Sequence, residues 1–154
     1  MPYLNDLISY LMKRNIAFHQ VNAKIIIFEL KFYKDNGSAE KVELEVHQSG
    51  NSLLVKATNN RYPNLCPNRH INDGGWFCLG LDEDVSQLTI NQWVMNLKLY
   101  LDAQQKCEDK GVWPRGGEIK EWAHGDGAKY QKIVEQYYGQ FQKNCLGLTL
   151  DQLR

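Results

Sequence analysis

The residues with the most chemical potential lie in a glycine-rich segment near the middle of the chain. Residues 62–81 read Tyr-Pro-Asn-Leu-Cys-Pro-Asn-Arg-His-Ile-Asn-Asp-Gly-Gly-Trp-Phe-Cys-Leu-Gly-Leu. Gly74 and Gly75 accept positive φ and let a second backbone approach closely, so an extended chain could lie across the following Cys78. A thiol with the ordinary pKa of about 8.5 is only a few per cent ionised at pH 7, but sulfur is nucleophilic enough for that fraction to react. Cys78 is therefore the candidate nucleophile.

Polar side chains near this cysteine could assist acyl transfer. Asn68 and Asn72 carry amide N–H groups that can donate to an oxyanion without competing as nucleophiles. His70 and, farther along, His124 can deprotonate an incoming amine or orient a neighbour, because imidazole titrates near neutral pH. Each residue also has a structural interpretation: Asn caps turns, a loop His forms hydrogen bonds, and Cys78 can pack as a small apolar side chain. The pattern alone leaves both interpretations open.

The other three cysteines are interpreted as structural. They are Cys66, Cys107 and Cys145. Cys107 lies in the later half of one expected helix, and Cys145 lies just past another. The chain has no Cys-x-x-Cys pair and no closely spaced His pair, which are the spacings typical of zinc sites. We therefore predict no metal and no cofactor.

Composition limits the classes of function. The 154 residues are 43% hydrophobic and carry 18 basic and 18 acidic side chains. This size and balance predict one globular domain over residues 1–154, without the net positive charge that drives nucleic-acid binding. The longest apolar run, residues 25–28, is far too short to span a bilayer, and the N-terminal residues do not resemble a signal peptide. We expect a cytoplasmic protein without nucleic-acid or membrane partners.

Hydrophobic periodicity predicts the first half of the fold. Apolar residues recur at helical spacing over residues 4–14, which indicates an amphipathic helix. Residues 24–33 and 42–47 alternate apolar and polar side chains, and residues 53–57 follow after a second turn, as in strands with one buried side. Turn residues separate these segments, so we predict a three-stranded antiparallel meander.

Two helices are predicted after the meander and the long irregular stretch 59–87. Thr89 and Gln92 have the spacing of a capping box before an apolar stripe over residues 90–108. A last helix is expected to begin near residue 126 and to end before Gly147. A helix, a meander, a long loop and C-terminal helices describe an α+β domain. Long irregular loops in compact domains are usually functional.

The loop resembles the catalytic segment of ubiquitin-conjugating enzymes. In that family a Tyr-Pro ends the third strand, a His-Pro-Asn box follows, and a nucleophilic Cys-Leu precedes a helix that begins Leu-Thr-Ile. Here the matching residues are Tyr62-Pro63, Pro67-Asn68, Cys78-Leu79 and Leu88-Thr89-Ile90, whereas Cys66 replaces the His of the box. The resemblance covers roughly residues 4–108 and implies a ubiquitin-conjugating-enzyme-like fold with Cys78 as the nucleophile.

Residues 69–79 and 122–125 are closer to the bacterial branch of this family, found in CBASS antiphage operons. That resemblance implies a stand-alone conjugating enzyme that forms a thioester on Cys78 with the C-terminus of a cGAS-like nucleotidyltransferase and passes it to an amine. An activating enzyme is a second partner wherever the donor needs activation.

Two other function classes remain open on the sequence. One is a catalytically inactive conjugating-fold binding module, although such a module has no need of the thiol in its Cys-Leu context. The other is a cysteine hydrolase, for which Cys78, His70 and Asn72 could supply the nucleophile, the base and an orienting group. Product analysis separates the three functions. A conjugating enzyme would transfer the acyl group to an amine, a binding module would transfer none, and a hydrolase would transfer it to water.

Overall fold

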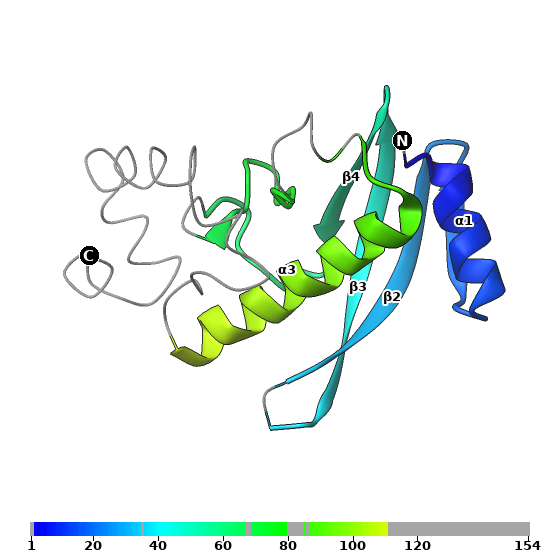
Figure 1. Cartoon of the computed structure of the whole chain (residues 1–154). Helices are drawn as coiled ribbons and strands as arrows, with labels where there is room; N and C mark the ends of the chain where they lie inside the picture. The colour runs from blue at the N-terminus through cyan, green and yellow to red at the C-terminus, as the bar shows by residue number, and fades with distance from the viewer. Residues whose placement is uncertain (1, 35, 67–68, 80–84, 86, 111–154) are drawn as a thin grey trace.

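The described part of the chain folds into a four-stranded antiparallel sheet with two helices (Figure 1). The computed structural model describes residues 2–34, 36–66, 69–79, 85 and 87–110. The elements are α1 (Leu4–Lys13), β1 (Phe18–Asn22), β2 (Ile25–Tyr33), β3 (Ala39–Ser49), β4 (Ser52–Ala57) and α3 (Ile90–Lys110). The strands are hydrogen-bonded in the order in which they occur in the chain. This architecture confirms the α+β prediction and is compatible with the conjugating-enzyme-like fold.

Alternating side chains build one buried face of the sheet. In the antiparallel register of β2 and β3, Ile26 lies opposite Val46 and Phe28 lies opposite Leu44, and all four side chains are buried. Side chains of a strand alternate between the two faces, so the polar residues between them point outward. The predicted strands 24–33, 42–47 and 53–57 are thereby confirmed, with β3 longer at both ends.

The prediction of three strands is wrong, because β1 adds a fourth at the edge of the sheet. Phe18 pairs with Phe28 of β2, but it is only half-buried, and the other four side chains of β1 are exposed. Main-chain hydrogen bonds hold this strand, rather than burial of alternate apolar side chains. Its sequence therefore lacks the periodicity that would have revealed it.

Both helices pack their apolar residues into the same core as the sheet. α1 buries Leu4, Leu7 and Leu11, which confirms the amphipathic helix predicted near the N-terminus. α3 crosses the sheet in Figure 1 and buries Trp93 and Leu97. The last predicted helix, from near residue 126, lies outside the described residues.

The start of α3 has the predicted capping box. The Gln92 backbone N–H donates to the Thr89 hydroxyl oxygen at 3.2 Å, and the Thr89 N–H donates to the Gln92 side-chain oxygen at 2.9 Å. These two bonds satisfy N–H groups that have no partner within the helix. The capping box thus fixes where α3 begins after the loop.

Neither described helix is long and apolar enough to cross a membrane. The single domain over residues 1–154 and the cytoplasmic location stay predictions.

Candidate active site

The candidate site lies on the loop between β4 and α3, and main-chain bonds attach this loop to the sheet. The Phe77 N–H donates to the Val55 carbonyl of β4 at 2.8 Å, and Trp76 pairs with Lys56 in an isolated bridge. β4 is an edge strand, so its outer side has main-chain groups to offer. The segment that leads into Cys78 therefore continues the sheet beyond β4.

A glycine turn precedes this segment. The Asn72 N–H donates to the Trp76 carbonyl at 2.8 Å, and the Gly75 N–H donates to the Asn72 carbonyl at 3.0 Å. Gly74 and Gly75 have φ of 87° and 84°, as the sequence predicts. A Cβ on Gly74 would also lie 3.2 Å from the Trp76 ring. Gly74 therefore meets both a backbone and a packing requirement.

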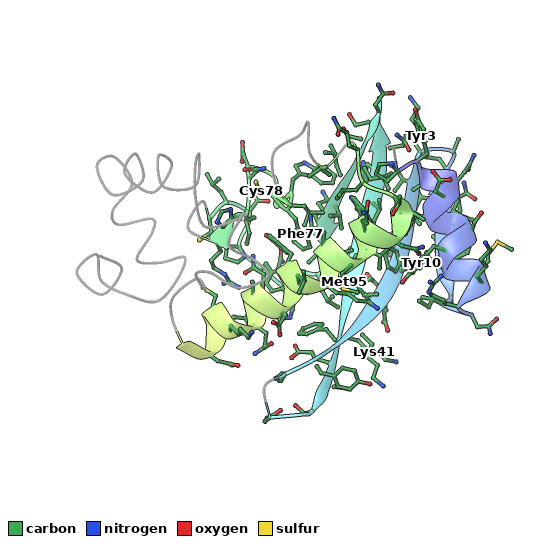
Figure 2. The ribbon with its side chains drawn as sticks, in the orientation of Figure 1. Tyr3, Tyr10, Lys41, Phe77, Cys78 and Met95 are labelled. Atoms are coloured by element: carbon green, nitrogen blue, oxygen red, sulfur yellow. The ribbon has the colours of Figure 1, made fainter. Side chains whose placement is uncertain are left out.

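Cys78 is the most accessible of the described cysteines. Its side chain is partly exposed, whereas Cys66 and Cys107 are 1% and 2% exposed. Burial also raises the pKa of the Cys107 thiol to about 11, so that thiol is un-ionised at neutral pH. In Figure 2 the labels place Phe77 near α3 and Cys78 farther from the helix. Cys78 is thus the described cysteine best placed to meet a partner.

The structure brings His70 and Cys78 together through the main chain. The Cys78 N–H donates to the His70 carbonyl at 2.8 Å, and His70 has the left-handed φ of 53°. Burial lowers the pKa of the His70 imidazole to about 4, so the ring is neutral at pH 7. A neutral ring can accept a proton, but a pKa so far below 7 makes it a weak base. The low pKa argues against general-base catalysis by the imidazole, whereas the His70 main-chain carbonyl holds the backbone of Cys78.

The other predicted site residues are placed only in part. Asn72 lies at the start of the glycine turn, where its main chain holds the turn and its side chain is exposed. The amide is therefore accessible to a ligand at the surface. Asn68 and His124 lie outside the described residues, and their assignment stays a prediction.

Sequence reasoning missed a polar cluster under the loop, formed by Arg69 with Tyr100, Gln104 and Glu108 of α3, in which all but the exposed Glu108 are buried. Arg69 Nε donates to Gln104 Oε1 at 2.7 Å, and Arg69 Nη2 lies 3.2 Å from Glu108 Oε1. Gln104 Nε2 donates to the Arg69 carbonyl at 2.7 Å, and the Tyr100 hydroxyl donates to the His70 carbonyl at 2.9 Å. The sequence signal that could have indicated this cluster is the four-residue spacing of Tyr100, Gln104 and Glu108, which places them on one face of the helix.

Glu108 also connects this cluster to a second arginine. Arg61 Nη1 donates to Glu108 Oε1 at 2.7 Å, and Arg61 Nη2 donates to Glu40 Oε1 at 2.9 Å. Arg61 lies where the loop leaves β4, and Glu40 lies at the start of β3. The loop is therefore joined to the sheet and to α3 by the same chain of charges.

Within the ranges that the structure describes, no group of three or more His, Cys, Asp or Glu side chains is arranged to hold a metal ion.

A family model described as the prokaryotic E2 domain matches residues 14–115, which include the sheet, the loop with Cys78 and α3. The matched segment is more than half of the chain. No match was found among curated proteins or among solved structures. E2 denotes the ubiquitin-conjugating class, and the candidate nucleophile of this chain is Cys78, within the loop between β4 and α3. The chain belongs to the prokaryotic E2 domain family.

Proposed function

We propose that this protein is a cysteine-dependent acyl transferase of the ubiquitin-conjugating type, with Cys78 as the acyl carrier. The observation that carries the proposal is the partly exposed thiol of Cys78, at the end of a glycine turn, in a chain of the prokaryotic E2 domain family. An acyl carrier needs a thiol that a second protein can reach.

The reaction has two balanced steps. In loading, the Cys78 thiolate attacks the activated C-terminal carbonyl carbon of a donor protein, a C–S bond forms, and the activating group leaves with its bonding electrons. In discharge, an amine nitrogen attacks the same carbon and loses a proton. The C–S bond then breaks, and its electron pair returns to Cys78 as thiolate.

The loop supplies candidate helpers for these steps. Asn72 and Asn68 would donate to the oxyanion of the tetrahedral intermediate, and each such donor typically contributes about 10²–10³ in rate. His70 would orient the thiol segment or the amine, and His124 is the alternative proton acceptor. The glycine turn would let the extended donor tail lie close to the backbone.

For the partner, we propose a cGAS-like nucleotidyltransferase whose C-terminal carboxyl is the acyl donor, with conjugation acting in antiphage signalling. This choice rests on the resemblance of residues 69–79 to the CBASS branch. A free carboxylate does not acylate a thiol, so the donor must arrive as a thioester or an adenylate made by an activating enzyme.

A cysteine hydrolase agrees less well with the site. Its histidine would have to take up the thiol proton at neutral pH, which a partly buried imidazole with a pKa of about 4 opposes. An inactive binding module also agrees less well with the site, because such a module does not need the accessible thiol of Cys78.

Product analysis distinguishes these functions. The chain, the nucleotidyltransferase, an activating enzyme and ATP are incubated, and the loaded species is then chased with lysine or with buffer alone. We expect the acyl group to appear on the amine much faster than as free carboxylate. Rapid release to water would favour the hydrolase, and no loaded species would favour the binding module.

A further inference from the structure

The cluster that joins α3 to the loop is hydrogen-bonded to the His70 carbonyl, which also accepts the N–H of the candidate nucleophile Cys78. We propose that Tyr100 and Gln104 are positioning residues that hold Cys78 in its reactive geometry. The kinetic part of this inference rests on the proposed function, whereas the structural part concerns the free chain alone.

The turn that contains His70 needs such support. The Cys66 carbonyl accepts the N–H groups of Arg69 at 2.9 Å and Ile71 at 3.0 Å, and the Ile71 carbonyl accepts the Cys66 N–H at 2.9 Å. This tight loop leaves His70 at a φ of 53°, in the left-handed region. Residues other than glycine remain there only where their surroundings hold them.

Gln104 holds the residue before His70 with both ends of its amide. Its nitrogen donates to the Arg69 carbonyl at 2.7 Å, and its oxygen accepts from Arg69 Nε at 2.7 Å. Gln104 is 0% exposed and Arg69 is 6% exposed, so water does not replace either bond. An amide that turned over would lose both contacts and leave buried polar groups unpaired.

Tyr100 contacts the backbone next to Cys78 in two ways. Its hydroxyl donates to the His70 carbonyl at 2.9 Å, and that carbonyl also accepts the Cys78 N–H at 2.8 Å. Its ring stacks on Phe77, the residue before Cys78, with ring centres 4.5 Å apart. Burial holds the pKa of the Tyr100 hydroxyl well above its usual range, so the group keeps the proton that it donates.

The two helix residues act as one unit. Gln104 Nε2 lies 2.8 Å from the Tyr100 oxygen, so this amide nitrogen can donate one hydrogen to Arg69 and the other to Tyr100. The Tyr100 oxygen accepts that bond and donates its own hydrogen to His70. A continuous chain of hydrogen bonds therefore connects α3 to the Cys78 N–H through the His70 carbonyl.

Acyl transfer depends on such positioning. The reacting atoms must approach to about 3–3.5 Å with aligned orbitals, and a displacement of about 1 Å can lower the rate about 100-fold. A helix packed into the core holds the Cys78 sulfur in position more rigidly than the loop alone would. The cluster therefore affects the reaction without touching the donor or the amine.

The first test removes one hydroxyl. Tyr100→Phe keeps the ring on Phe77 and deletes the donor to His70. We expect single-turnover loading of Cys78 to slow about tenfold at a temperature where the variant is fully folded. Tyr10→Phe is the matched control, since Figure 2 shows Tyr10 on α1 at the other side of the molecule from Cys78. Loading of Tyr100→Phe at the wild-type rate would overturn the inference.

A second pair of variants tests the amide. Gln104→Met removes both bonds to Arg69 at similar volume. Gln105→Met is the control, because the neighbouring Gln105 amide donates to Asp109 on the same helix and makes no hydrogen bond to the described residues of the loop. We expect slower loading only for Gln104→Met. Equal rates in the two variants would contradict the positioning role.

Hydrogen exchange of the Cys78 amide tests the contacts without any partner. In the free chain, Tyr100→Phe should speed exchange of this N–H about tenfold and leave the amides of β2 and β3 unchanged. Faster exchange at all of these amides, or an unchanged exchange rate at Cys78, would overturn the inference. Local loosening in a chain whose wild type never forms a thioester would support the positioning contacts and overturn the proposed function.

Discussion

His70 shows how burial sets the chemistry of a single residue. Its folded pKa of about 4 lies below the ordinary value of 6.5, so the unfolded chain binds the proton more tightly. The folded state is therefore favoured above pH 6.5 and loses stability as the pH falls toward 4. The same burial keeps the imidazole neutral wherever acyl transfer would operate.

The pH dependence of stability tests this assignment. From pH 7 to pH 5 we expect His70 to lower the free energy of unfolding by about 2 kcal/mol, given 1.36 kcal/mol per pKa unit. Urea denaturation at the two pH values measures the change. In His70→Asn, chosen because Asn tolerates left-handed backbone, this part of the pH dependence should disappear. An unchanged slope would show that other groups are responsible.

Gly74 and Gly37 form a matched pair for the glycine turn. Both have positive φ, 87° and 83°, but a Cβ on Gly37 would meet nothing within 4 Å, whereas on Gly74 it would crowd Trp76. In both alanine variants, backbone strain should lower the free energy of unfolding by about 1 kcal/mol. Gly74→Ala should lose about 1 kcal/mol more, since a well-packed site resists added atoms. Equal melting temperatures would mean that Trp76 moves freely aside.

At the scale of elements, α3 connects the core to the loop. Its N-terminus is fixed by the capping box, and its later turns carry Tyr100 and Gln104 to the loop. Thr89→Ala should lower the free energy of unfolding by about 1 kcal/mol, measured by urea denaturation. Asn91→Ala, an exposed change in the same turn, should have a much smaller effect. A similar loss in both would assign the cost to helix propensity rather than to the cap.

Local periodicity predicted the elements well, because the spacing of apolar residues along a helix or strand follows from which of its faces is buried. The strand segments 24–33 and 42–47, the helix at 90–108 and the capping box all match the structure. β1 could not be found in this way, since main-chain bonds hold it at an edge. The Arg69–Gln104 bonds join a loop to a helix far along the chain, and no local pattern reports such a pair.

The candidate site was predictable to a similar extent. Cys78, His70 and the glycine turn follow from residue type and spacing. The structure adds a main-chain bond between Cys78 and His70, and the roles of both residues stay predictions. The low pKa of His70 was not predictable, because burial depends on tertiary packing. Asn68 and His124 stay predictions.

At the scale of the whole molecule, charge argues for a protein partner. Eighteen basic side chains balance 18 acidic ones. Nucleic-acid binding draws much of its affinity from phosphate contacts by Lys and Arg, so we expect only weak, salt-sensitive binding. Fluorescence anisotropy with labelled DNA and RNA at two salt concentrations measures it. A submicromolar complex that persists in high salt would contradict this prediction.

The central claim is that Cys78 carries the acyl group, and mapping the covalent adduct tests it most directly. The chain is incubated with the nucleotidyltransferase, an activating enzyme and ATP, and the products are analysed by peptide mass spectrometry without reductant. The account predicts a thiol-sensitive adduct on the peptide with Cys78, a longer-lived oxyester in Cys78→Ser, and an unchanged adduct in Cys107→Ser. An adduct on Cys66, Cys107 or Cys145, or one that survives in Cys78→Ser as a thioester, would contradict it.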